Sequence, residues 1–139
     1  MSSFKIFDIA GSGMSAQSVR LNTVASNLAN ADSVSGDPNS VYRAKHPVFQ
    51  AVLSAGLGAD PATASVAVSG IEENQAAPAS RCDPGNPMAD AQGYVYAPNV
   101  NIVEEMTDMI SASRSYQNNV EVLNTARDLM LDTLKLGQS

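Results

Sequence analysis

Residues 101–136, NIVEEMTDMISASRSYQNNVEVLNTARDLMLDTLKL, contain no proline and repeat apolar side chains at alternating steps of three and four, interrupted only by the polar Ser113 and Arg127. This spacing places them on one stripe of a long α-helix, as in a coiled-coil seam. Asn101 followed by Glu104 predicts the first turn of the helix, because an asparagine side chain can accept from free N–H groups there. Gly137 predicts its end. The predicted packing residues of the stripe are Met106, Met109, Tyr116, Val120, Leu123, Met130 and Leu134.

A similar repeat occurs at the other end of the chain, where apolar residues recur every seven positions. Only three of residues 1–31 are charged, which favours a helix covered by polypeptide on several sides. Gly11 and Gly13 lower helix propensity by roughly 1 kcal/mol each relative to alanine, so we expect a break or a close helix contact near them. The predicted packing residues of this helix are Phe7, Met14, Leu21, Val24 and Leu28.

The middle of the chain has a different composition, because all seven prolines lie within residues 38–98. Such a segment favours short strands and turns over long helices. We expect a break at His46-Pro47, a loop or sheet edge at residues 54–64 and a turn at residues 83–87. The expected strands are residues 41–45, 48–53, 64–71 and 93–97.

These segments predict an α+β fold, in which long N- and C-terminal helices pair as an antiparallel coiled coil with a small β-rich element between them. The boundaries are an N-terminal arm at residues 1–31, the β-rich element at 32–98 and a C-terminal arm at 99–139. The two stripes bury too little apolar surface to order both helices alone. We therefore expect the arms to be largely disordered in dilute monomer and to become helical on assembly.

Composition excludes several kinds of function. A net charge of −6 argues against non-specific nucleic-acid binding, which needs an excess of cations. The single cysteine, Cys82, excludes an intramolecular disulfide and a multi-cysteine zinc site. No apolar run is long enough for membrane insertion, and the first residues lack the features of a cleaved secretory signal. We expect no enzymatic activity and no cofactor.

Four features imitate chemical sites without completing one. Residues 11–16 fit G-x-G-x-x-A, but no second strand ends at Asp32 as a dinucleotide fold requires. His46 is the only histidine, so it cannot form a two-histidine metal site. Residues 83–90 fail the spacing of a calcium loop, and a lone free cysteine is usually a small apolar residue. No catalytic constellation remains.

Both ends of the chain carry motifs of one known family. The segment Ser26-Asn-Leu-Ala-Asn-Ala31 resembles the N-terminal signature of bacterial flagellar rod, hook and hook-associated axial proteins, and residues 98–126 resemble their C-terminal signature. Both signatures on so short a chain indicate the small proximal rod proteins. Ile6-Phe-Asp-Ile-Ala-Gly11, Tyr42-Arg-Ala-Lys45 and residues 83–90 resemble those proteins in particular.

The resemblance implies a structural subunit of the flagellar drive shaft, exported unfolded by the flagellar type III apparatus and assembled in the periplasmic space. Its partners would be other proximal and distal rod proteins, copies of itself and the membrane-ring/export-gate junction. The helices 4–31 and 101–136 would form an inner tube, with the β-rich element facing outward. We also predict that Asn27 and Asn30 make polar contacts that fix the turn out of the first helix. The alternative from the residues is a soluble coiled-coil adaptor or secretion chaperone.

Overall fold

Two long helices and two β-ribbons make up the chain in a computed structural model, which describes residues 3–53 and 64–137. The elements are α1 (Ser3–Asn30), β1 (Lys45–Leu53), β2 (Ala64–Glu73), β3 (Ala79–Cys82), β4 (Tyr94–Ala97) and α2 (Ile102–Leu136). The α+β fold with helices at both ends of a small β region is confirmed.

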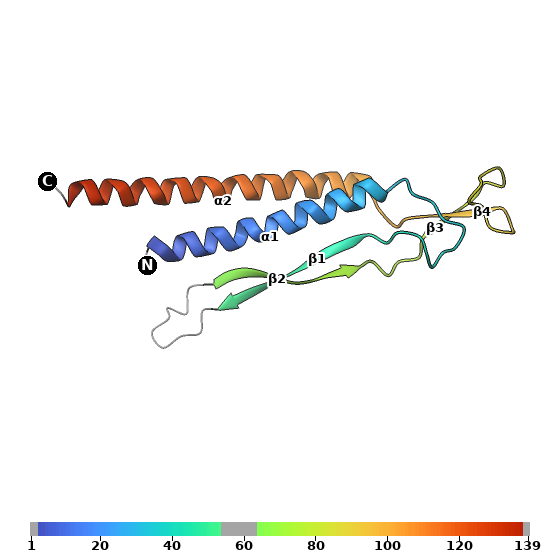
Figure 1. Ribbon diagram of the computed structural model, residues 1–139, viewed down its shortest axis with the longest axis horizontal. Helices are drawn as coiled ribbons and strands as arrows, with labels where there is room; N and C mark the ends of the chain where they lie inside the picture. Colours follow the sequence, from blue (N-terminus) through green and yellow to red (C-terminus); the bar gives the residue numbers. More distant parts are fainter. Residues whose placement is uncertain (1–2, 54–63, 138–139) are drawn as a thin grey trace.

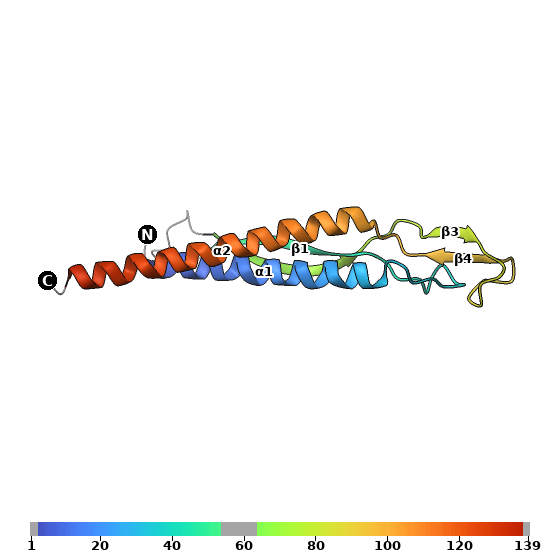
Figure 2. The same ribbon diagram turned by 90° about the horizontal axis from the view of Figure 1, so that it is seen from above.

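The molecule is elongated, and α1 is its central layer (Figure 1). On one side α1 packs along α2, which runs in the opposite direction, and on the other side it contacts both β1 and β2. The β3–β4 ribbon lies beyond the end of the helices (Figure 2). At the opposite end, the last turns of α2 extend past the first turn of α1 in both views.

Local sequence signals define the two helices well. The Asn101 side chain accepts from the backbone N–H groups of Val103 and Glu104, so the predicted start of α2 is confirmed. Gly137 closes α2 through its N–H to the Thr133 carbonyl, 3.1 Å away, and its φ of −76° is right-handed, unlike the left-handed conformation common at this position.

The two glycines of α1 have different surroundings. The helix runs unbroken through both. A Cβ added to Gly11 would meet nothing within 4 Å, whereas one added to Gly13 would lie 2.9 Å from Nδ2 of Asn119 in α2. The expected close helix contact therefore occurs at Gly13, and the expected break does not occur.

The strands differ from the sequence expectation in two places. Residues 41–44 are irregular, and β1 instead runs through His46 and Pro47. Proline is tolerated there because a two-stranded ribbon leaves one side of each strand unpaired. β1 pairs with β2 antiparallel, from Lys45 opposite Glu73 to Leu53 opposite Ala64. The loop expected at 54–64 falls, up to residue 63, outside the described residues.

The second ribbon is short and was expected only in part. β4 agrees with the strand expected at residues 93–97, but β3, which pairs with it from Ala79 opposite Ala97 to Cys82 opposite Tyr94, was not expected. A single bridge between Ser35 and Tyr96 joins the chain after α1 to this ribbon.

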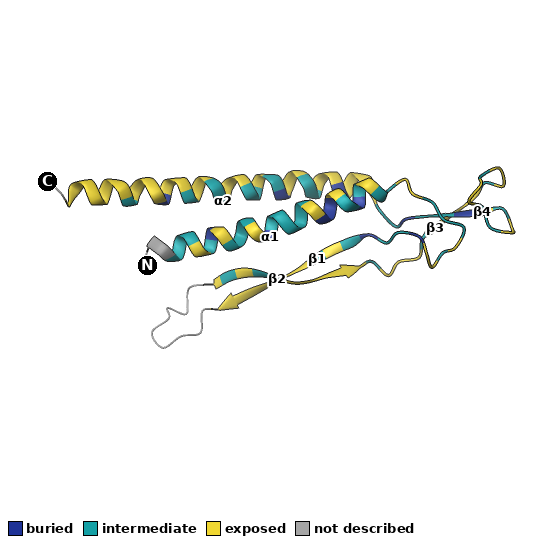
Figure 3. Cartoon of the chain, in the orientation of Figure 1, coloured by how far each residue is buried: buried dark blue, intermediate teal, exposed yellow. Residues whose placement is uncertain are grey.

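The buried apolar side chains are small. Among the described residues they are Ala10, Ala16, Val24, Val41, Ala44, Val95, Ala112 and Ala126. They lie where α1 meets α2 and where the chain leaves the helices, while most of α2 is exposed (Figure 3). The largest fully buried side chains are Val95 and Asn27. A chain that buries alanine and leaves several leucines exposed is built to pack further.

Candidate functional site: the helix pair and its polar junction

Residues spaced by seven in α1 meet residues spaced by seven in α2, in one antiparallel register. Gly13 lies against Asn119, and fourteen residues further along α1 the Asn27 amide donates to Oε1 of Glu105 at 2.9 Å. Small or polar side chains at these positions let the two backbones approach closely. The set that we call the pairing row is Ile6, Gly13, Arg20 and Asn27 of α1 with Ala126, Asn119, Ala112 and Glu105 of α2.

The rest of the pairing row agrees with this register. Near the start of α1, Ile6 and Ala126 line one open groove of about 340 Å³ between the helices. Further along, Arg20 donates to Oδ1 of Asp108 at 2.7 Å, one helical turn before Ala112, which is fully buried. The Arg20–Asp108 pair is partly exposed, so solvent screens it.

The predicted packing residues lie beside the pairing row, either one position after or three positions before a position of its seven-residue repeat. Since a helix turns by about 100° per residue, their stripes face to the side of the contact between α1 and α2. Val24 is buried, and Met106 and Leu134 are 54% and 63% exposed, so these two do not pack inside the chain. The half-buried predicted residues are Phe7, Met14, Leu21, Leu28, Met109, Tyr116, Val120, Leu123 and Met130. Their role at a subunit interface stays a prediction.

Other large apolar side chains of α2 are exposed that the sequence reasoning did not select. They lie on more than one face of the helix, so a single heptad stripe cannot include them all. The sequence indicated them only indirectly, because α2 has more apolar residues than a single heptad stripe can hold. These residues are Ile102, Val103, Ile110, Val122, Leu129, Leu131 and Leu136.

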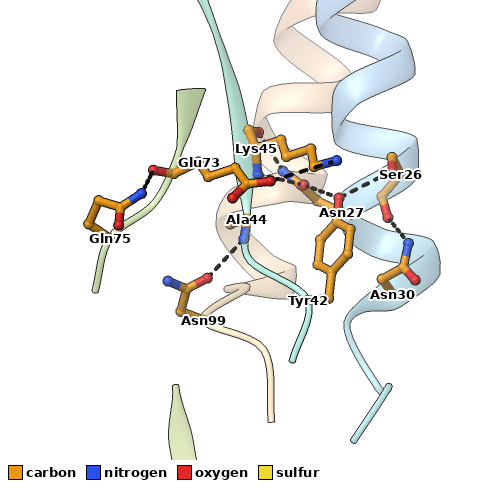
Figure 4. A network of polar contacts seen from close by, with 9 residues as sticks. All are labelled: Ser26, Asn27, Asn30, Tyr42, Ala44, Lys45, Glu73, Gln75 and Asn99. Carbon is orange, nitrogen blue, oxygen red and sulfur yellow. Dashed lines mark hydrogen bonds and ion pairs between the residues drawn. The ribbon is translucent and has the colours of Figure 1, made fainter. Parts of the chain in front are cut away.

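Asn27 uses its whole hydrogen-bonding capacity where three segments of the chain converge (Figure 4). Its Nδ2 donates to the Lys45 carbonyl at 2.8 Å and to Glu105, while its Oδ1 accepts from the Lys45 N–H and from the Tyr42 hydroxyl, both at 2.9 Å. The side chain is fully buried. It thus joins the last turns of α1, the start of β1 and the first turns of α2. These are the polar contacts expected of Asn27, with partners that sequence could not name.

Two further asparagines complete what we call the polar junction, the contacts around Asn27, Asn30 and Asn99. Asn30 donates to the Ser26 carbonyl at 2.8 Å, within α1 itself. Asn99 accepts from the Ala44 N–H and donates to the carbonyls of Asn74 and Ala76, so it ties the segments before β1, after β2 and before α2 (Figure 4). Sequence reasoning missed Asn99. The one local signal was its position two residues before Asn101, where the chain enters α2.

Glu105 is the one buried acid of the described residues, only 4% exposed. Its Oε1 accepts from Asn27, but its Oε2 is buried without a hydrogen-bond partner in the described structure. Burial raises the pKa of Glu105, against the lowering effects of the Asn27 hydrogen bond and of His46; Asp108 and Glu104 raise it further. A charged carboxylate is therefore disfavoured in the folded junction.

The features that imitate chemical sites do not form one. Residues 11–16 lie inside α1, so there is no glycine-rich turn to hold a phosphate. His46 and Cys82 are exposed on separate ribbons. Asp83 and Asp90 bond within their own turns. Across residues 3–53 and 64–137, no group of three or more potential metal ligands occurs, and neither helix is long and apolar enough to cross a membrane.

Comparison with known proteins finds family matches at both ends of the chain. A sequence profile of flagella basal body rod proteins matches residues 7–36, and one of the flagellar basal body rod FlgEFG protein C-terminal region matches residues 91–136. Over 138 residues the chain is 57% identical to the flagellar basal-body rod protein FlgC of Escherichia coli O6:H1, covering 99% of this chain and all of the relative. The chain belongs to the FlgC family of flagellar basal-body rod proteins.

Other FlgC relatives extend the match. FlgC of Salmonella typhimurium strain LT2 is 55% identical over 99% of this chain and 100% of its own length. FlgC of Aquifex aeolicus strain VF5 is 42% identical over 97% of both chains. The resemblance found at the two ends of the sequence is thereby confirmed. The protein is a structural subunit of the flagellar basal-body rod. Its family consists of structural proteins and not of enzymes.

The two profile matches contain both partners of the central helix contact. Asn27 lies in the N-terminal match, and Glu105 lies in the C-terminal match. A buried hydrogen bond therefore links the two family regions within this chain.

Proposed function

We propose that each subunit builds the rod by packing its α1–α2 pair against helix pairs of neighbouring subunits, so that torque passes through helix contacts. The observation that carries this proposal is the contrast between the two kinds of helix surface. The pairing row inside the chain is small and polar, whereas Val103, Leu129 and Leu134 are 73%, 64% and 63% exposed on α2. An apolar surface of this kind is typical of protein–protein contacts. Neighbouring subunits would bury what the chain leaves exposed.

The predicted packing residues supply the contact surface in this proposal. The stripe from Phe7 to Leu28 in α1 and the stripe from Met106 to Leu134 in α2 lie beside the pairing row, not in it. Most side chains in these stripes are half-buried in one chain and can be fully buried between chains. Each helix would then contact its own partner through the pairing row and a neighbour through its apolar stripe.

Assembly would also supply much of the order of the helices. Inside one chain, the helix contact buries mainly alanine side chains and a few polar groups. Small buried side chains give little apolar burial per ordered residue, so the entropy of two long helices is poorly offset. The arms would be largely disordered in dilute monomer and become helical when neighbours cover them. Such a chain is suited to export in an unfolded state.

The proposal also includes the position of the subunit in the rod and its neighbours. We place the subunit in the periplasmic part of the rod, exported by the flagellar type III apparatus. Its neighbours would be copies of itself, other proximal and distal rod proteins, and the membrane-ring/export-gate junction at the base. The helix pair would line the inner tube, and the β1–β2 and β3–β4 ribbons would face outward. A soluble coiled-coil adaptor or secretion chaperone is not favoured, because the full-length relatives are named as rod proteins.

The sharpest test uses an exposed apolar residue. Leu134→Asp removes an apolar group that the isolated chain leaves 63% exposed, so it costs the single subunit little. We expect it to abolish incorporation into isolated basal bodies and swimming, while the exported chain is still detected outside the cytoplasm. Leu134→Met keeps an apolar side chain and is expected to swim. Normal incorporation of the aspartate variant would contradict the proposal.

A further inference from the structure

We infer that the buried Asn27–Glu105 pair sets the register in which the two helices of one subunit pair, and passes that register to the start of β1. The inference goes beyond the proposed function, because it concerns pairing within a subunit and not contacts between subunits. It rests on one contact between α1 and α2, at 2.9 Å, and on the four hydrogen bonds that Asn27 makes.

The shape of the pairing row does not by itself select one register. Sliding α2 by seven residues in one direction would place Gly13 opposite Ala126 and Asn27 opposite Ala112. These are again small residues, and the backbones could approach as closely. A register of this kind differs from the observed one chiefly in what happens to the polar side chains.

Sliding α2 by seven residues in the other direction is even favoured by charge. It would place Gly13 opposite Ala112 and Arg20 opposite Glu105, an attractive pair. Asn27 would then lie opposite Pro98, which precedes α2, and would lose its acceptor in α2. The observed register can therefore be selected only by a contact that neither shifted register can form.

The Asn27–Glu105 pair is such a contact. In either shifted register the Asn27 amide would lose Glu105, and a buried donor without a partner is costly. A single polar pair in an otherwise permissive helix interface is known to select one register. By contrast, the Arg20–Asp108 pair is partly exposed, so water can replace either partner.

The same side chain extends the register into the β region. Asn27 holds both the N–H and the carbonyl of Lys45, the first residue of β1, and accepts from Tyr42 just before it. Since α1 also contacts β1 and β2 along its length, fixing Lys45 fixes where the ribbon begins against the helix. Asn27 therefore aligns three elements at once, with Glu105 supplying the contact to α2.

Intramolecular cross-linking reads the register directly. The full-length chain, with Cys82→Ser, would carry Gly13→Cys together with one of three partners, and would replace the native copy in flagellated cells. Asn119→Cys reports the observed register, while Ala112→Cys and Ala126→Cys report the two shifted ones, each combined with Asn119→Ala to leave room for the cysteine at position 13. Mild oxidation of isolated basal bodies and non-reducing electrophoresis give the yield of each. We expect the Gly13–Asn119 pair to give nearly all of the cross-links in the chain with native Asn27 and Glu105.

The decisive variant replaces the polar pair by Asn27→Leu with Glu105→Leu. We expect the ratio of shifted to native cross-links to rise about tenfold, the factor that corresponds to ~1.4 kcal/mol. Glu105→Gln keeps an acceptor for Asn27 and is expected to retain the native cross-link alone. Arg20→Ala with Asp108→Ala is the control in the same interface, and is also expected to keep the register.

Two results would overturn the inference. One is an unchanged Gly13–Asn119 yield, without shifted products, in the double leucine variant. The other is a loss of the Gly13–Asn119 cross-link without a gain of either shifted one, because that would assign Asn27 and Glu105 a role in stability and not in register. The same cross-links, measured in purified chain at high concentration, separate this inference from a failure of rod incorporation.

Discussion

Asn27 and Glu105 lie 78 positions apart in the chain, and the amide of the first donates to the carboxyl of the second at 2.9 Å between two helices. The amide is fully buried and the carboxyl is 4% exposed. A helix interface with so little apolar burial depends on such polar contacts for its geometry and on neighbours for its stability.

Asn27→Ala should damage the junction more than a change at the neighbouring asparagine. It leaves Glu105 and the Lys45 backbone without partners, a loss of about 1–3 kcal/mol for each buried group left unsatisfied. Asn30→Ala removes one side-chain hydrogen bond, to Ser26, and should cost about 1 kcal/mol. Protease resistance of isolated basal bodies and swimming in soft agar measure the difference. Equal behaviour of the two variants would contradict the role given to Asn27.

Glu105 predicts a pH dependence of helix formation. Because its pKa is raised in the folded chain, folding takes up a proton there. Helix stability should thus fall as the pH rises from the ordinary value of 4.5 through the raised folded value, and should recover as the pH is lowered. Circular dichroism of purified chain, at a concentration at which copies associate and the helices form, measures this effect between neutral pH and mildly acidic pH, with the sequence pI of about 4.5 as the lower limit for solubility.

Two variants of equal charge test the assignment of that pH dependence. Glu105→Gln removes the buried carboxyl, so it should raise the helix content at neutral pH and flatten the pH profile. Glu104→Gln, at an exposed neighbouring position, should leave the profile unchanged. If both variants behave alike, the pH dependence does not come from Glu105.

The two glycines of α1 make opposite predictions. Gly11→Ala meets nothing within 4 Å and should stabilise the helix by about 1 kcal/mol. Gly13→Leu would place a side chain where a Cβ alone is already 2.9 Å from Asn119, so it should separate the helices and block rod incorporation. Swimming assays and incorporation into isolated basal bodies distinguish the two. Normal incorporation of Gly13→Leu would show that the helices do not need this close approach.

The predicted apolar stripes are tested on both helices. Leu28→Asp and Leu123→Asp place a charge at half-buried positions beside the pairing row. Both should stop incorporation and swimming while leaving export intact, because a charge buried between subunits without a partner is strongly unfavourable. Leu28→Met and Leu123→Met, which preserve apolar character, should swim. Swimming of both aspartate variants would show that these positions face no neighbour.

Much of the fold could be predicted from the sequence because its signals are local. Asn101, the absence of proline and Gly137 define α2 to within a residue. A glycine within the repeat of α1 indicated a close helix contact, which occurs at Gly13. β3 could not be predicted, because its four residues owe their conformation to pairing with β4 and not to their own β propensity.

The face that pairs within the chain was harder to predict. In each helix two rows repeat every seven residues, one of large apolar residues and one of small or polar residues. An isolated chain is expected to bury the apolar row, so sequence reasoning selected it as the packing surface. Inside the chain, Gly13 and Asn119 instead meet in the small row. Both rows have a role if each helix packs on two sides, with the small or polar row facing the partner helix of the same chain and the apolar row facing a neighbouring subunit.

Circular dichroism of the purified, dilute full-length chain tests the central claim, that neighbours supply the order of the helices, most directly. The two helices span 28 and 35 residues in the folded subunit. We predict that the dilute chain shows only a minor part of this helix content, rising with concentration as copies associate. Near-complete helix at the lowest concentration, independent of dilution, would contradict the claim.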